Sequence, residues 1–164
     1  MGFIRILAPD LRKRIMINII GTYECKADVK GRVMFPSALK KQLNSVMQEG
    51  FVIKRSVFNK CLEIHPISEW NIVEQQLASL SSIRNRNREF VRSIVRYASY
   101  VQYDKQGRII IPDNLKIYAS IDKEVSIIGM ISKIELWSPE KIKKYDNNQM
   151  NIDDFDDLAD DISF

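Results

Sequence analysis

The same pattern occurs twice in the sequence, and this internal repeat constrains the fold more than any other feature. Residues 28–39 read DVKGRVMFPSAL and residues 104–115 read DKQGRIIIPDNL, so both follow D-x-x-G-R-[VI]-x-[FI]-P-x-x-L. The correspondence continues downstream, from residues 62–64 to residues 134–136. A repeat of this kind is a supersecondary unit that cannot bury its apolar face alone. We therefore predict two copies of one small unit that pack against each other.

Each copy predicts a β-β-α-β-β unit followed by a further helix. A tight turn at Asp-x-x-Gly joins two extended segments, the second of them rich in β-branched residues. The proline after the second segment opens a short helix, because the first helical turn does not need the N–H that proline lacks. Two more strands follow, and four short strands leave edges and an apolar face uncovered. The predicted fold is α+β, mainly β, with the two copies packed face to face into a barrel-like core.

The predicted division of the chain has five parts. They are an N-terminal extension (residues 1–19), a first repeat (20–66), a helical connector (67–98), a second repeat (99–145) and an acidic tail (146–164) that we expect to be disordered. The connector has helical apolar spacing and five arginines between residues 84 and 96. We interpret it as two helices that cover the core and keep a solvated face, and contact with DNA or a neighbouring subunit is the alternative.

Charge is distributed unevenly along the chain. The net charge is +4, but the tail from Asp146 onward holds seven aspartates and no lysine or arginine, so the rest of the chain carries +11. A basic body with a separate acidic tail indicates a polyanionic partner such as nucleic acid. A solvated surface with a solubilising tail explains the charge alone equally well.

The repeated turn contains four residues that local structure explains. The carboxylates of Asp28 and Asp104 can accept backbone N–H groups within their own turns. Gly31 and Gly107 supply the positive φ that such a turn needs. These residues form the turn motif, and they require no partner outside the turn.

The arginine that follows each turn glycine is not required by the turn. Arg32 and Arg108, with Lys30 and Lys105 beside them, place two matched cationic groups on rigid turns. A guanidinium fork suits phosphate oxygens and the guanine edge, so these residues are candidates for DNA binding. The alternative is an Asp–Arg ion pair that braces each turn. Both can hold together, because a braced arginine is also a pre-organised one.

Other function classes find little support in the sequence. Asp28 and Asp104 could form a paired-carboxylate site, but each is occupied by its turn, and no nucleophile–base pair or phosphate loop is present. Cys25, Cys61 and His65 lack metal-ligand spacing, and we expect both cysteines to be buried, reduced thiols. No apolar run approaches the roughly 20 residues of a membrane-spanning helix. We therefore expect a cytoplasmic protein with no catalytic activity, cofactor, metal, small-molecule substrate or membrane anchor.

These motifs resemble those of the MraZ family, whose members carry two AbrB-like repeats. The resemblance rests on residues 28–36 and 104–112, on CLEIHPISEW at 61–70 and on IELWS at 134–138, and it covers most of the chain. It implies a pair of AbrB-like swapped-hairpin units that form an intramolecular pseudo-dimer. It also implies a nucleoid-associated transcriptional regulator, which assembles into a homo-oligomeric ring and binds short direct repeats of double-stranded DNA upstream of the division and cell-wall gene cluster.

The family's D-x-x-x-R element falls on the two turns described above. By this resemblance, Arg32 and Arg108 are the expected DNA contacts, and Lys30 and Lys105 are the expected phosphate contacts. Gln106 is the repeat counterpart of Lys30, so we expect the two halves to contact DNA unequally. Two other functions stay open: an AbrB-like antitoxin, whose tail would bind a toxin, and a ring-shaped adaptor that binds proteins.

Overall fold

The computed structural model describes residues 17–148 together with Phe155 and Leu158. The first repeat forms β1 (Thr22–Lys26), β2 (Arg32–Met34), α2 (Ser37–Leu43), η1 (Met47–Glu49), β3 (Phe51–Arg55) and β4 (Leu62–Pro66). The connector forms α3 (Ile67–Ala78) and α4 (Asn85–Val95). The second repeat forms β5 (Ser99–Val101), β6 (Arg108–Ile110), α5 (Asp113–Ala119), β7 (Glu124–Gly129), β8 (Ile134–Trp137) and α6 (Pro139–Asn147). The predicted order of elements is confirmed in both copies, whereas the prediction of a disordered tail falls largely outside the described residues.

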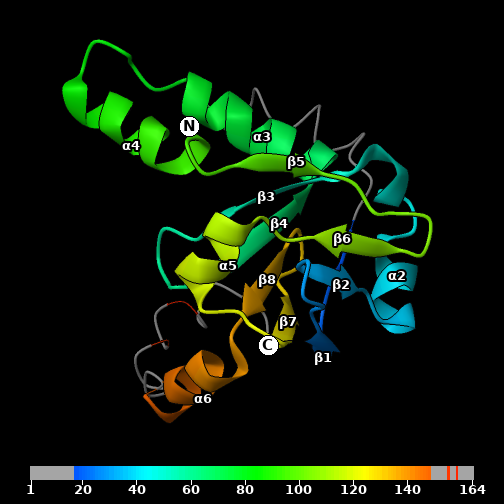
Figure 1. Ribbon diagram of the computed structural model, residues 1–164. Helices are drawn as coiled ribbons and strands as arrows, with labels where there is room; N and C mark the ends of the chain where they lie inside the picture. The colour runs from blue at the N-terminus through cyan, green and yellow to red at the C-terminus, as the bar shows by residue number, and fades with distance from the viewer. Residues whose placement is uncertain (1–16, 149–154, 156–157, 159–164) are drawn as a thin grey trace.

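The two repeats exchange strands. β1 of the first repeat pairs with β7 of the second, and β5 of the second pairs with β3 of the first, all antiparallel. β4 and β8 pair at the centre, which gives a six-stranded sheet in the order β1-β7-β8-β4-β3-β5 (Figure 1). Each unit completes its sheet with strands of the other, because a single unit would leave its strand edges unpaired.

The barrel-like closure that we expected from the sequence is not formed by the described strands. The six-stranded sheet is open, and β1 and β5 are its edges. β2 and β6 are three residues each and pair with each other in a separate two-stranded ribbon, so they do not join the edges of the large sheet. Figure 1 shows this ribbon between α2 and α5. The fold is therefore α+β with a largely antiparallel open sheet and a ribbon packed over it.

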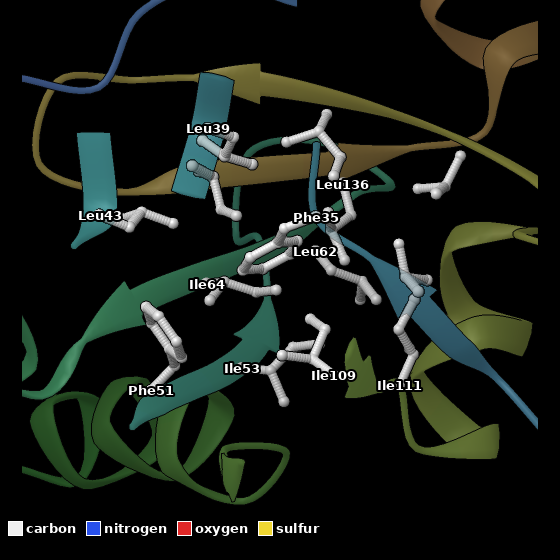
Figure 2. Close-up of a cluster of buried hydrophobic side chains, with 14 of the residues drawn as sticks. Phe35, Leu39, Leu43, Phe51, Ile53, Leu62, Ile64, Ile109, Ile111 and Leu136 are labelled. Atoms are coloured by element: carbon white, nitrogen blue, oxygen red, sulfur yellow. The ribbon is translucent and has the colours of Figure 1, made fainter. Parts of the chain in front are cut away.

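The main core lies between the ribbon and one face of the six-stranded sheet. Side chains alternate along β4, so Leu62 and Ile64 point into the core while Glu63 lies on the opposite face. The rings of Phe35 and Phe51 meet edge to face, with their centroids 6.1 Å apart. Figure 2 shows the core side chains of β3 and β4 pointing toward those of the ribbon and its neighbours: Phe35, Leu39, Phe51, Ile53, Leu62, Ile64, Ile109 and Ile111.

Ile17 and Ile19, at the end of the predicted N-terminal extension, belong to this core. The side chains of Ile17 and Ile19 are buried with the apolar residues of both repeats. Ile19 and Ile131 also exchange two backbone hydrogen bonds, of 2.9 and 2.8 Å. The segment just before β1 is therefore held against the turn that precedes β8.

The opposite face of the sheet carries a buried cluster of charges. The side chain of Glu63 is 4% exposed and accepts hydrogen bonds from Lys133 Nζ at 2.9 Å and from Lys54. His65 Nε2 lies 3.3 Å from the same carboxylate. Burial alone would raise the pKa of Glu63, but the contacts with His65, Lys54 and Lys133 outweigh burial and hold the pKa well below its usual range. The carboxylate is thus ionised and shared between two lysines.

The connector forms a helical hairpin on this face, as predicted. α3 contacts β3 and β4, and α4 contacts β3, through a small apolar cluster of Val52, Trp70 and Ile94. The hairpin extends to one side of the sheet in Figure 1. Its predicted solvated face is present, because the five arginines are all exposed: Arg84, Arg86, Arg88, Arg92 and Arg96.

Both cysteines are free thiols, and they differ in depth. Cys61 is buried, whereas Cys25 is only half-buried, which corrects the expectation that both are buried. Burial raises the pKa of Cys61 to about 12 and that of Cys25 to about 11, with smaller contributions from neighbouring carboxylates. Such thiols are poor nucleophiles at neutral pH. In the part of the chain that the structure describes, no helix is long and apolar enough to cross a membrane.

Candidate nucleic-acid interface

The first turn is built around the carboxylate of Asp28. One carboxylate oxygen, Oδ1, accepts the backbone N–H groups of Lys30 and Arg32, each at 2.9 Å. The other, Oδ2, accepts Nε of Arg32 at 2.6 Å. Gly31, with a φ of 79°, donates its N–H to the carbonyl of Asp28 at 2.9 Å. One aspartate therefore closes the turn and fixes the plane of the guanidinium.

The second turn repeats this arrangement almost atom for atom. Asp104 Oδ1 accepts the N–H groups of Gln106 and Arg108 at 2.9 Å each, and Oδ2 accepts Nε of Arg108 at 2.7 Å. Gly107 has a φ of 80° and donates to the carbonyl of Asp104 at 2.9 Å. Both glycines are thus required for their backbone conformation, as the sequence predicted.

In each turn the arginine is therefore both ion-paired with its aspartate and pre-organised by that pairing. Hydrogen bonds from the backbone N–H and then the guanidinium of Arg32 hold the pKa of Asp28 below its usual range, and Arg108 does the same for Asp104. The pairing uses Nε, so the two outer nitrogens of Arg32 have no hydrogen-bond partner among the described residues. In the described part of the chain, Arg108 Nη2 donates to Gln106 Oε1 at 3.3 Å. Among the described residues, both outer nitrogens of Arg32 and Nη1 of Arg108 are thus left for another acceptor.

The ribbon places the two arginines on one outward face. β2 and β6 pair around Val33 and Ile109, which are fully buried and point into the core. Arg32 lies opposite Ile110, and Met34 lies opposite Arg108, so these four alternate side chains point away from the core. The two halves of the ribbon are related by an approximate twofold axis through the central Val33–Ile109 pair.

Two lysines that our sequence interpretation missed complete the basic surface. Lys40 of α2 places Nζ 2.6 Å from the point that a Cβ at Gly107 would occupy. Lys116 of α5 places Cδ 3.1 Å from the same point at Gly31. Each lysine therefore reaches the turn of the other repeat. The sequence did contain a sign of them, because the last leucine of the repeat pattern is followed by a lysine in both copies.

Lys30 and Lys105 lie on the turns but at different positions. Lys30 is the third residue of its turn and Lys105 is the second, and both are exposed. With Arg32, Arg108, Lys40 and Lys116, they surround the outward face of the ribbon. We call these six cations, together with Met34 and Ile110, the ribbon face.

Comparison with known proteins explains the duplication. The family model of the MraZ protein, which is described as antitoxin-like, matches residues 19–93 and again residues 94–162. Together the two matches cover most of the chain, and each contains one complete turn motif. The chain belongs to the MraZ family.

MraZ proteins of several bacteria are similar to this chain over nearly their whole length. The transcriptional regulator MraZ of Christiangramia forsetii is 44% identical over 147 residues, which are 90% of this chain and 94% of the relative. That of Flavobacterium psychrophilum is 40% identical over 147 residues, 90% and 92% of the two chains. That of Clostridium beijerinckii is 41% identical over 140 residues, 85% and 93%. The resemblance to MraZ noted in the sequence is thus confirmed.

Proposed function

We propose that the chain is a transcriptional regulator that binds double-stranded DNA through the ribbon face. The observation that carries this proposal is the pair of arginines, Arg32 and Arg108, held in matching geometry on a two-stranded antiparallel ribbon. The major groove of B-DNA is about 12 Å wide and admits a two-stranded β-ribbon. The name of the MraZ relatives, transcriptional regulator, agrees with this use.

The ribbon face has the chemistry that reading DNA requires. A guanidinium that is already oriented loses little side-chain freedom on binding, and its free outer edge can donate two hydrogen bonds to O6 and N7 of guanine or to a phosphate. Lys30, Lys40, Lys105 and Lys116 at the rim suit phosphate oxygens on either side of the groove. The arginines would then supply base discrimination, and the lysines the salt-dependent part of the affinity.

The finer part of the proposal concerns the site and the assembly. The exchanged strands support an AbrB-like swapped-hairpin pseudo-dimer, in which each chain presents one ribbon with an approximate twofold axis. We propose that chains assemble into a homo-oligomeric ring and bind short direct repeats upstream of the division and cell-wall gene cluster. Linked ribbons would gain affinity from effective concentration when successive repeats are spaced to match them.

Fluorescence anisotropy with the purified full-length protein tests the proposal. The probe is a labelled duplex from upstream of the protein's own gene, beside a scrambled duplex of equal composition. Arg32→Ala and Arg108→Ala should each weaken specific binding by roughly 1–3 kcal/mol, the usual cost of losing a base-reading arginine. Arg86→Ala, which removes an equally charged but distant side chain of the hairpin, is the matched control. Equal affinity for both duplexes, or equal effects of all three substitutions, would contradict the proposal.

A further inference from the structure

Two apolar side chains stand among the cations of the ribbon face. Met34 is 43% exposed and Ile110 is 53% exposed, and they occupy the same position of the two repeats. The core does not need them, because Val33 and Ile109 are the ribbon residues that fill it. Met34 Sδ accepts a hydrogen bond from Lys40 Nζ at 3.3 Å, which ties the methionine to the basic rim. The same apolar character at the same outward position of both repeats indicates a shared role.

We infer that Met34 and Ile110 read thymine methyl groups in the major groove. This inference rests on the proposed DNA binding, and it adds thymine to the guanine that the arginines are proposed to recognise. The C5-methyl of thymine is the apolar group that a base pair presents in the major groove, and apolar side chains recognise it by contact. An apolar residue at the centre of a basic surface suits that group and has no favourable partner among phosphates.

The spacing of the ribbon agrees with the spacing of bases. Met34 faces Arg108 across the ribbon, and Arg32 faces Ile110 one outward position further along. Two residues of a strand advance by about 6.8 Å, which corresponds to two base-pair steps of about 3.4 Å. Each arginine thus has an apolar neighbour directly across the ribbon. The ribbon face would therefore recognise guanine and thymine within the same few base pairs, twice, in an approximately twofold arrangement.

Replacing thymine by deoxyuridine removes the methyl group and leaves base pairing unchanged. We would compare the upstream duplex with the same duplex in which the thymines of the repeats are deoxyuridine, for the wild type and for Met34→Ala and Ile110→Ala. The wild type should bind the deoxyuridine duplex about fourfold more weakly for each contacted methyl, from the transfer free energy of one buried methyl-sized group. Met34→Ala and Ile110→Ala should each lose the part of the preference for thymine over deoxyuridine that comes from the methyl group contacted by the replaced side chain. Ile83→Ala, which truncates an 87% exposed side chain of the α3–α4 hairpin, should keep all of it.

The outcomes separate this inference from the function on which it rests. Equal binding of both duplexes by the wild type, with Arg32→Ala still weakening it, would overturn the thymine contact and leave the proposed function standing. Equal losses on deoxyuridine for the wild type and all variants would also overturn it, because the methyl groups would then be sensed elsewhere. Failure of the wild type to bind the repeat duplex at all would remove the proposed function and the inference together.

Discussion

The buried cluster around Glu63 and the Asp–Arg ion pairs of the two turns both join a carboxylate to cations, but they differ in how far they are buried. The carboxylate of Glu63 is 4% exposed and gives its oxygens to lysines of the same chain. Asp28 and Arg32 are 34% and 31% exposed, and of the guanidinium nitrogens the aspartate accepts only Nε. In the first case both carboxylate oxygens are used by lysines of the chain, whereas in the second the outer guanidinium nitrogens of Arg32 remain available. The degree of burial therefore distinguishes an ion pair that stabilises the sheet from an ion pair that orients a cation toward solvent.

The largest expected effect concerns the buried side of this comparison. Glu63→Gln leaves Lys54, a side chain that is 6% exposed, without a counter-charge. Breaking a buried ion pair on one side costs about 3–5 kcal/mol, so we expect a loss of that order in the free energy of unfolding, measured by urea denaturation. Glu89→Gln removes an exposed partner of Arg92 and should change stability by no more than about 1 kcal/mol. A similar, small change in both variants would show that the Glu63 cluster is not structural.

The same cluster predicts a pH dependence of stability. The pKa of Glu63 is lower in the folded chain than in the unfolded chain, so the unfolded chain binds more protons between the two values. The stabilisation is complete above the unfolded value of about 4.3 and is lost as the pH falls toward the folded value. Thermal unfolding below about pH 5 should therefore be less pH-dependent for Glu63→Gln than for the wild type. Parallel pH profiles of the two proteins would contradict this assignment.

A smaller effect is expected from the two lysines that cross between repeats. Lys40→Ala and Lys116→Ala should leave base preference unchanged, because the proposal assigns these side chains to phosphates. Each should reduce the slope of log affinity against log salt concentration by about 0.9. The measurement is the DNA titration repeated at several salt concentrations, with Lys141→Ala of α6 as a control of equal charge. An unchanged slope for Lys40→Ala would place that lysine outside the interface.

The turn motif was predictable from the sequence because all of its contacts are local. Asp28, Gly31 and Arg32 lie within five residues, and the duplication shows which of them recur. Lys40 and Lys116 were missed because each acts on the turn of the other repeat, which depends on how the copies pack.

In the fold, too, the features set by local sequence were predicted and those set by long-range packing were not. The order of strands and helices follows from local pattern and proline positions, and it was predicted for both copies. The barrel-like closure was not confirmed, because the strand partners depend on the whole fold and the short β2 and β6 pair with each other. The Glu63 cluster was also missed, since alternation along β4 marks Glu63 as facing away from the core but does not reveal that Lys54 and Lys133 pair with it.

The most direct test of the central claim, that the turn aspartates pre-organise the arginines for DNA, is the affinity of Asp28→Asn and Asp104→Asn for the upstream duplex. Asparagine keeps an oxygen for the backbone N–H groups but loses the second acceptor that holds Nε of the arginine. The substitution also makes the ribbon face more positive, so charge alone predicts tighter binding. Our account predicts weaker binding, by roughly threefold to tenfold for each turn, from the loss of one orienting hydrogen bond. Unchanged or tighter binding by both variants would contradict it.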